Sequence, residues 1–286
     1  MNASTVINYG VYQLKKSLLW DHYYNNVNSP KHKGPVVNTP EDMQEIVRDL
    51  ERNNFDVKEY RIDVEEYKRY LADAQYQNFT YYRGGKQKNF TEKSLEHYIA
   101  FKLLNLNETD VYIDIANDKS PTPEIYHNLT GCTIYRQDLS FPEGVHGNVI
   151  GGDAGNLPLS ENFASKMALH CSFEHFEGDA DIRYIREVNR ILCNGGKVCI
   201  LPLYLSTEYV IQNDPAKTII KIEKDAVCYC AKGWGNRHGR FYDVPHLASR
   251  IQKNLGDLEL TIYVVQNEKE VDTSCYLKFI GLFEKK

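Results

Sequence analysis

The second part of the chain alternates short apolar runs with helical patterns, and this alternation restricts the folds open to it. The apolar runs cover residues 111–115, 132–135, 148–150, 166–169 and 197–201. Between the last two runs, Ile182, Ile185 and Val188 recur at helical spacing. Strands that alternate with helices form βαβ units with a parallel sheet. The pattern predicts an α/β fold that ends in two further strands, at 258–265 and 275–283.

The first hundred residues lack this alternation and indicate a mainly helical segment. Thr39 and Pro40 predict a helix start, with a hydroxyl cap followed by proline in the first turn. A second start is predicted at Thr91 as the cap, with Phe90 packing against Leu95. A helix from there would lead directly into the first strand.

These patterns divide the chain into two expected parts. We expect a helical N-terminal segment over residues 1–107 that covers a substrate site. An α/β domain would follow over residues 108–286, with an insertion at about 204–245. The insertion interrupts the strand and helix pattern after the run at 197–201.

Composition and charge exclude several classes of protein. The chain is 42% hydrophobic and 26% charged, near the averages of globular proteins. Its net charge of −5 gives no electrostatic footprint for nucleic acid. No window has the roughly 18 uninterrupted apolar residues of a membrane span, and the first residues lack the features of a signal peptide. The seven cysteines are odd in number and lack CxxC spacing, which indicates reduced thiols. We expect a cytoplasmic protein that acts on a small molecule and binds neither nucleic acid nor a membrane.

Three short motifs follow one another along the chain. They are Gly152-Asp-Ala-Gly-Asn-Leu-Pro-Leu159, Ala168-Leu-His-Cys-Ser-Phe-Glu-His-Phe176 and Arg190-Ile-Leu-Cys-Asn-Gly-Gly-Lys197. Their order and spacing resemble the second half of a class I S-adenosylmethionine (SAM)-dependent methyltransferase domain of the small-molecule type. The resemblance covers roughly residues 108–286. It implies a Rossmann-like, seven-stranded, mostly parallel sheet with a C-terminal antiparallel hairpin, and SAM as the cofactor.

The resemblance also implies which residues bind the cofactor. Asp138, which closes the second strand, would accept hydrogen bonds from the ribose diol. Asp153 and Ala154 would bind the adenine ring. Leu139 would pack on the adenine face, or would be an ordinary core residue. The implied cofactor-binding residues are Asp114, Ala116, Asp118, Asp138, Leu139, Asp153 and Ala154.

The loop after the first strand departs from the family pattern. The family has glycines at alternate positions after the acid, whereas this chain has Ala116, Asp118 and Ser120. Glycine lets the backbone approach a ligand closely and adopt positive φ. Asp and Asn can also adopt the left-handed region, but a side chain at position 118 would crowd the methionine carboxylate.

The loop after the fourth strand would face the methyl group in this fold. The resemblance implies His175 as the general base, because histidine titrates near physiological pH. Glu174 would orient this base or bind substrate, and His170 is a further catalytic candidate. In an alternative interpretation, Glu174 and His175 cap the following helix and pack under the sheet. The spacing of the His, Glu and Asp residues here matches no metal-binding signature, so we expect no metal.

Aromatic and cationic residues outside the sheet indicate where an acceptor would bind. Such side chains can grip a sugar, a phosphate or a carboxylate. The candidate substrate-binding residues are Tyr82, Arg83, Tyr204, Trp234, Arg237 and Arg240. The same residues would suit an oligomer interface, such as that of a homodimer.

The hypothesis is a SAM-dependent methyltransferase that methylates O or N of a small polar acceptor, a sugar or glycan precursor or a specialised metabolite. The altered loop after Asp114 favours one alternative: a catalytically inactive methyltransferase-like domain that serves as a binding or assembly partner. A nicotinamide dehydrogenase is a weaker alternative, because the glycine fingerprint is missing.

Overall fold

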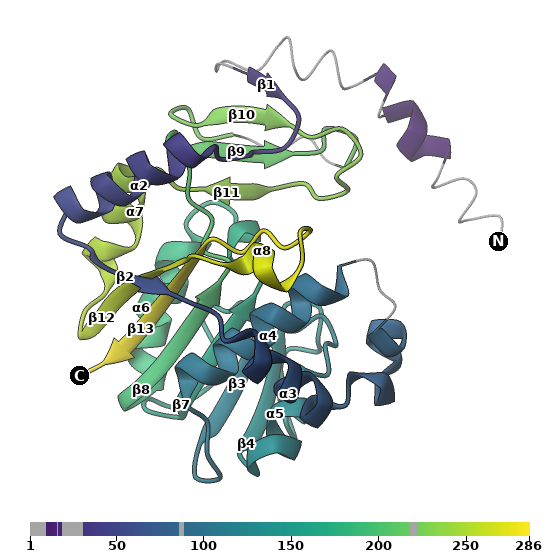
Figure 1. Cartoon of the computed structure of the whole chain (residues 1–286), viewed down its shortest axis with the longest axis vertical. Coiled ribbons are helices and arrows are strands. Elements are labelled where there is room, and N and C mark those ends of the chain that lie inside the picture. The colour runs from purple at the N-terminus through teal and green to yellow at the C-terminus, as the bar shows by residue number, and fades with distance from the viewer. Residues whose placement is uncertain (1–9, 16, 19–30, 86–88, 218–221) are drawn as a thin grey trace. The chain divides into compact units, whose positions relative to one another are not determined.

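The computed structural model describes residues 10–15, 17–18, 31–85, 89–217 and 222–286 (Figure 1). The chain forms two compact units. Unit 1 contains Met1–Asn53, Glu174–Glu177 and Tyr204–Ala248, and unit 2 contains Asn54–Phe173, Gly178–Leu203 and Ser249–Lys286. The division therefore does not fall at residue 107. The segment expected as an insertion joins the N-terminal residues in unit 1, and residues 54–107 are part of unit 2.

Unit 2 contains a nine-stranded, mostly parallel sheet with the order β2-β12-β13-β8-β7-β3-β4-β6-β5. Its strands are β2 (Asp56–Tyr60), β3 (Val111–Ile115), β4 (Thr133–Asp138), β5 (Gly144–His146), β6 (Val149–Gly151), β7 (Ala164–His170), β8 (Leu192–Leu201), β12 (Leu258–Val265) and β13 (Phe279–Lys285). β12 and β13 pair antiparallel with each other, and β13 pairs antiparallel with β8. Seven strands were expected; the sheet has two more because β2 and β5 extend its two edges.

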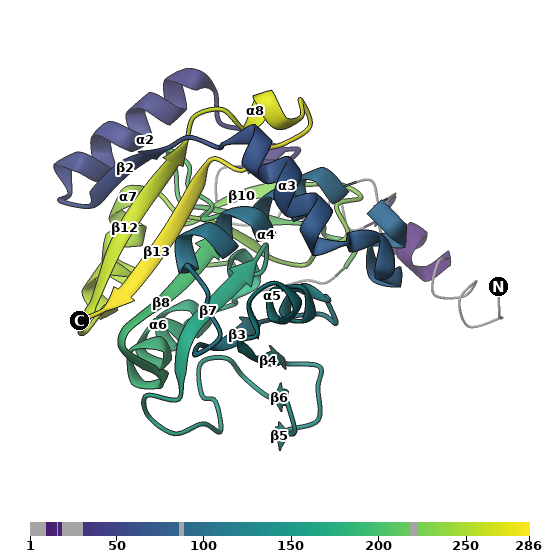
Figure 2. The same ribbon diagram turned by 60° about the horizontal axis from the view of Figure 1, so that its bottom comes forward.

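The strand order of unit 2 reverses between β3 and β7. From β3 the chain passes to β4 and β6 on one side, then returns to β7 and β8 on the other. Right-handed crossovers in opposite directions place helices on opposite faces of a sheet. Accordingly α4 and α5 cover one face and α6 covers the other (Figure 2). This reversal is where ligands bind in open α/β sheets.

The helices of unit 2 are short. They are α3 (Val64–Ala74), α4 (Phe90–Leu104), α5 (Thr122–Thr130), α6 (Ala180–Ile191) and α8 (Glu268–Val271), with 3-10 turns at Tyr76–Asn78, Thr80–Gly85 and Gln252–Asn254. Two elements include residues of both units, the 3-10 turn Phe173–His175 and α7 (Val244–Arg250).

The two predicted helix starts had different outcomes. Thr39 caps α2 (Pro40–Arg52), and its hydroxyl accepts a hydrogen bond from the Asp42 N–H at 3.1 Å. The prediction at Thr91 was wrong, since α4 begins at Phe90 with Asn89 as its N-cap. The acid that follows Thr91, Glu92, is buried and accepts a hydrogen bond from the Tyr276 N–H at 3.0 Å. This first turn is thus held by a distant segment of the chain.

The tyrosine-rich stretch forms part of the core of unit 2. Tyr67, Tyr70, Tyr76 and Tyr82 are all buried, and their hydroxyl groups bond to one another or to neighbouring polar side chains. A tyrosine can be buried at low cost when its hydroxyl has a partner. The abundance of tyrosine therefore reflects packing in this region.

Unit 1 contains a four-stranded sheet with the order β1-β10-β9-β11. Its strands are β1 (Lys31–Lys33), β9 (Val210–Asn213), β10 (Val227–Cys230) and β11 (Gly239–Phe241), and α2 belongs to the same unit. Its interior includes the charged residues Asp214 and Arg240. Asp214 accepts hydrogen bonds from the backbone N–H groups of Gly233 and Gly235.

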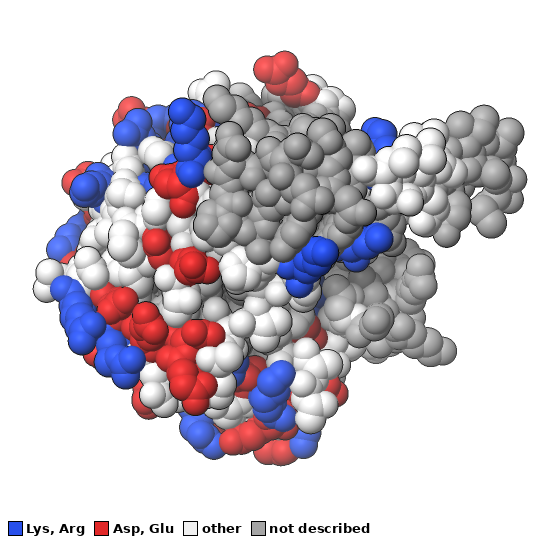
Figure 3. Space-filling model, turned by 90° about the horizontal axis from the view of Figure 1, so that it is seen from above, with Lys and Arg blue, Asp and Glu red and all other residues white. Residues whose placement is uncertain are grey.

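The surface carries both signs of charge. On the face shown in Figure 3, Lys and Arg side chains are interspersed with Asp and Glu, in line with the small net charge. No helix within the described ranges is long and apolar enough to span a bilayer. None of the seven cysteines forms a disulfide.

Candidate functional site

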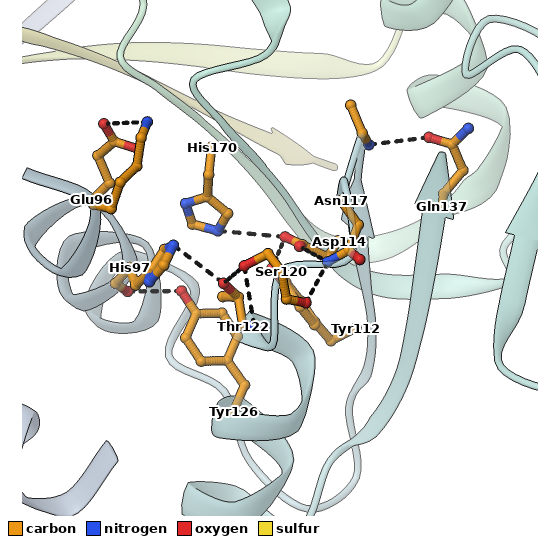
Figure 4. Close-up of polar contacts among 12 residues, drawn as sticks. Glu96, His97, Tyr112, Asp114, Asn117, Ser120, Thr122, Tyr126, Gln137 and His170 are labelled. Carbon is orange, nitrogen blue, oxygen red and sulfur yellow. Dashed lines mark hydrogen bonds and ion pairs between the residues drawn. The ribbon is translucent and has the colours of Figure 1, made fainter. Parts of the chain in front are cut away.

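The register of the sheet places Asp114 and His170 next to each other. β3 pairs parallel with β7, with Asp114 opposite Ala168. His170 lies two residues further along β7 than Ala168. Because side chains alternate between the faces of a strand, Asp114 and His170 share one face at the carboxyl ends of the two strands. The Nε2 atom of His170 lies 3.5 Å from Oδ1 of Asp114 (Figure 4).

Asp114 is a buried carboxylate held from two sides. Its Oδ1 accepts a hydrogen bond of 2.8 Å from the Tyr112 hydroxyl, and its Oδ2 accepts one of 2.6 Å from the Asn117 amide. Burial raises the pKa of Asp114 to about 6, and the two hydrogen bonds oppose this rise. The orientation of this carboxylate is therefore set by the chain itself.

His170 is buried without a hydrogen bond. Its side chain is only 8% exposed, and neither ring nitrogen has a hydrogen-bond partner. Burial, with a smaller contribution from the charge of Lys93, lowers the pKa of His170 to about 3. The imidazole is therefore neutral at physiological pH, and one of its nitrogens is a free acceptor.

Helix α4 lines the same cluster with His97 and an ion pair. The rings of His97 and His170 meet edge to face, with centroids 4.7 Å apart. The Nζ atom of Lys93 lies 3.0 and 3.1 Å from the carboxylate oxygens of Glu96. Burial would lower the pKa of Lys93, but the attraction of Glu96 raises it well above its ordinary value. The ammonium group is thus charged and paired.

The loop after β3 adopts the conformation that glycine would favour. Ala116, Asp118 and Lys119 have φ values of 54°, 44° and 64°, and such left-handed conformations cost L-residues about 1–2 kcal/mol each. Gln137 supports the loop, since its Oε1 accepts from the Ala116 N–H at 3.2 Å and its carbonyl accepts from the Asn117 N–H at 2.9 Å. The backbone is left-handed at two of the three altered positions, Ala116 and Asp118, even though glycine is absent.

The acid at the end of β4 already has partners in the chain. Oδ2 of Asp138 accepts a hydrogen bond of 2.9 Å from the Asp118 N–H, and Oδ1 accepts one of 2.8 Å from the Ser140 N–H. Leu139 is 75% exposed. This exposure excludes the alternative that Leu139 is an ordinary core residue.

Asp153, the acid expected to bind adenine, follows strand β6, which lies next to β4 in the sheet. Asp153 accepts hydrogen bonds of 2.6 Å from Arg183 and 2.8 Å from the Gly155 N–H. Partial burial would raise the pKa of Asp153, but these two partners together lower it. Ala154 is buried. Since β4 pairs with β6 and Asp138 lies opposite Gly151, the fold brings the predicted ribose and adenine residues to one edge of unit 2.

Glu174 and His175 belong to unit 1, whereas His170 belongs to unit 2. Nδ1 of His175 lies 2.5 Å from the carbonyl oxygen of His238, and its ring lies 5.8 Å from that of Trp234. The alternative that this pair caps the following helix is wrong, since the N-cap of α6 is Asp179. The three catalytic candidates are therefore not gathered within one unit.

Two of the predicted substrate-binding residues are buried. Arg240 is fully buried, and its guanidinium donates to the Tyr209 hydroxyl at 3.0 Å and to the Glu223 carboxylate at 2.9 Å. Tyr82 is 2% exposed, and its hydroxyl lies 2.8 Å from Oγ of Ser120. The expectation that they offer free groups to an acceptor is therefore corrected, because their polar groups hold the interior together.

The other predicted substrate-binding residues lie nearer the surface. Tyr204 packs on Phe241 with ring centroids 4.8 Å apart, and Trp234 is partly exposed. Arg237 is largely exposed and forms an ion pair with Glu177. Arg83 belongs to the turn Thr80–Gly85, and its side chain lies outside the described part of the structure.

Several residues of the cluster were not predicted. Tyr112 could have been found, since it precedes Asp114 by two residues and so shares its face of the strand. Lys93, Glu96 and His97 had no such signal, because only the packing of α4 on the sheet brings them to the carboxyl ends of the strands. Within the described ranges, no group of three or more His, Cys, Asp or Glu side chains is arranged to hold a metal ion.

Comparison with known proteins gives similarity of structure only. No family model and no curated protein matches the chain. Many similar solved structures are methyltransferases. One is the 1,6-didemethyltoxoflavin-N1-methyltransferase of Burkholderia thailandensis with bound S-adenosylhomocysteine (14% identity, 81% of this chain and 93% of that one, TM-score 0.46). Another is the CcbJ methyltransferase of Streptomyces caelestis (13%, 66% and 89%, 0.41). The PH0226 protein of Pyrococcus horikoshii OT3 is also similar in structure (14%, 77% and 99%, 0.46). At these values the likenesses carry no conclusion about function.

Proposed function

We propose that this protein transfers a methyl group from SAM to an oxygen or nitrogen of a small polar acceptor. The observation that carries the proposal is the left-handed loop at Ala116–Lys119, directly after β3, where the strand order reverses. Open α/β sheets bind their ligands at this point. Positive φ at Ala116 and Asp118 is the backbone conformation that glycine would favour there, so the absent glycines do not remove this part of the geometry that a cofactor needs.

The acids at the strand ends suit the two halves of an adenosine group. Each carboxylate oxygen of Asp138 accepts one backbone hydrogen bond, and each has a further lone pair for a ribose hydroxyl. Asp153 can likewise accept from an exocyclic amine, beside the small Ala154. When bound, SAM supplies an electrophilic methyl group on a sulfonium centre. The chain then has to align the acceptor and receive its proton.

We assign a sugar, in a glycan precursor or a specialised metabolite, as the acceptor class. The partly exposed Trp234 and the cationic Arg237 of unit 1 support this choice, since aromatic and guanidinium groups suit sugar rings and their anionic substituents. We place the reaction in the cytoplasm, because none of the seven cysteines is in a disulfide.

One specific observation favours the alternative of a domain that no longer transfers methyl groups. The carboxylates of Asp138 and Asp153 are both held by groups of the chain itself, the first by the Asp118 loop and the second by Arg183. If these contacts close the site, the fold serves as a binding or assembly module, for instance in a homodimer.

Calorimetric titration with SAM distinguishes the two functions. We expect saturable binding by the wild type and at least a tenfold weaker Kd for Asp138→Ala, a loss of about 1.4 kcal/mol. Glu143→Ala is the matched control, because Glu143 is an exposed acid shortly after the same strand. Absence of heat at millimolar SAM, or an Asp138→Ala variant that behaves like the control, would overturn the proposal.

A further inference from the structure

We propose that His170 and Asp114 form the proton-accepting pair of the transfer site, and that this pair selects acceptors whose reacting atom is a neutral O–H or N–H donor. The inference rests on the proposed methyl transfer and adds to it the reacting centre and the chemistry of the acceptor. It replaces His175 with His170 as the expected base, and it gives Asp114, which the resemblance assigns to the cofactor, the role of partner to this base.

The carboxylate selects the tautomer of the histidine. Nε2 of His170 faces Oδ1 of Asp114 at 3.5 Å, while Tyr112 and Asn117 hold the carboxylate in place. A nitrogen that faces a carboxylate carries the proton, so the lone pair is on Nδ1. The distance is longer than a hydrogen bond, as catalytic contacts commonly are before substrate binds.

The surrounding groups leave this acceptor free. The ring nitrogens of His97 lie 2.8 Å from the Tyr76 hydroxyl and 3.2 Å from that of Thr122, so His97 has partners of its own. Lys93 is paired with Glu96, but its charge still contributes to the low pKa of His170. A buried polar atom without a partner costs free energy unless a ligand or water pairs with it. Nδ1 of His170 is such an atom, and the nearby ammonium group favours an uncharged donor over a cationic one as its partner.

Asn117 holds a further unpaired acceptor on the other side of Asp114 (Figure 4). Its amide N–H donates to Asp114, whereas its Oδ1 is buried and has no partner. The lone pair that receives the proton is therefore the one on Nδ1 of His170. A carboxylate as the acceptor molecule would meet Asp114 and this lone pair unfavourably.

The proton moves as the new bond forms. The lone pair of the acceptor atom forms the bond to the methyl carbon, the S–C bond breaks, and its electron pair remains on sulfur. The proton of the acceptor passes to Nδ1 of His170, and the resulting imidazolium is balanced by Asp114. An unprotonated histidine suffices as the base, because the proton becomes strongly acidic once its oxygen or nitrogen is methylated.

Substitution tests the role of His170. Purified protein is incubated with tritiated SAM and a small-molecule extract of the source organism, and label transfer is measured beside the Kd for SAM. We expect His170→Asn to lower the transfer rate by about 10²–10⁴-fold while its Kd for SAM stays within about twofold of the wild type. The matched control is His146→Asn, an exposed histidine on β5, which should change neither quantity.

The tautomer gives a readout that needs no acceptor. In ¹⁵N-histidine spectra, the signals lost in His170→Asn identify this residue, and we expect them to show the Nε2–H tautomer. Asp114→Asn should raise the population of the Nδ1–H tautomer, because the charged partner is gone. An Nδ1–H tautomer in the wild type, or full transfer by His170→Asn, overturns the inference. Failure of the wild type to bind SAM removes the proposed function instead, so the two failures are distinguishable.

Discussion

The backbone N–H of Asp118 donates a hydrogen bond of 2.9 Å to Oδ2 of Asp138. This contact joins the left-handed loop after β3 to the end of β4, so the two parts of the expected cofactor site are linked before any ligand binds. A substitution in the loop after β3 should therefore alter SAM binding by Asp138, and a substitution of Asp138 should alter the loop.

Glycine at the first altered loop position should stabilise the protein. Ala116 has a φ of 54°, a conformation that glycine adopts without strain. We expect Ala116→Gly to raise the free energy of unfolding by roughly 0.5–1 kcal/mol, measured by urea denaturation. Ala72→Gly, at an exposed position in α3, is the control and should lower it by a similar amount. A loss at both positions would show that Ala116 is unstrained.

Removal of the Tyr82 hydroxyl should affect the loop after β3, where the cofactor is expected to bind. That hydroxyl contacts Oγ of Ser120 at 2.8 Å and Nε2 of His97 at 3.3 Å. We expect Tyr82→Phe to cost about 1–2 kcal/mol of stability and to weaken SAM binding in calorimetry. Tyr81→Phe is the control, because Tyr81 is 41% exposed. If Tyr82→Phe instead raises KM for the acceptor alone, the original expectation of substrate contact would stand.

The pH dependence of stability should report the burial of His170. Its pKa of about 3 in the folded protein lies below the value of about 6.5 in an unfolded chain. The neutral form therefore stabilises the fold above pH 6.5, and this contribution is lost as the pH falls toward 3. We expect the wild type to lose about 1.4 kcal/mol per pH unit relative to His170→Asn below pH 6. Parallel denaturation midpoints for the two proteins from pH 7 to pH 4.5 would contradict this.

The contribution of Asp114 to stability should change with pH in the opposite direction to that of His170. Its folded pKa of about 6 exceeds the unfolded value of about 3.9, so its contribution is present below pH 4 and is lost as the pH rises through 6. We expect the wild type to lose stability relative to Asp114→Asn between pH 4 and pH 6, in the same denaturation series. A difference that is constant with pH would show that Asp114 is not desolvated.

Two arginines of unit 1 should differ sharply in their effect on stability. Arg240 is fully buried, and its loss removes its hydrogen bonds to the Tyr209 hydroxyl and to the carboxylate of Glu223, whose side chain is 26% exposed. We expect Arg240→Met to cost about 3–5 kcal/mol. The control, Arg237→Met, removes a largely exposed ion pair with Glu177 and should cost less than about 1 kcal/mol. Thermal denaturation of the two variants compares them, and equal losses of stability would exclude the burial of Arg240 as the cause.

Local patterns predicted most strands of the sheet, but β13 begins at Phe279 and not at residue 275, and β2 and β5 were not predicted. The run Val111–Ile115 is β3 and the run Leu258–Val265 is β12, both with the expected bounds. β3 is recognisable because a strand buried on both faces is mostly apolar along its length. β12 is recognisable because buried apolar side chains alternate with more exposed ones along it. The start of α4 was harder to predict from local sequence, because Glu92 at that end is held by Tyr276, more than 180 residues further along the chain.

The sequence by itself determined the α/β alternation, the acids at the strand ends and the cap of α2, because each depends on residues near one another in the chain. Only the tertiary structure decided that Asp114 lies beside His170, that α4 adds His97 and a buried ion pair, and that Tyr82 and Arg240 are interior residues. The reason is physical: strand register and helix packing bring together groups that are distant in sequence, and burial then decides which polar atoms are paired and which are left for a ligand.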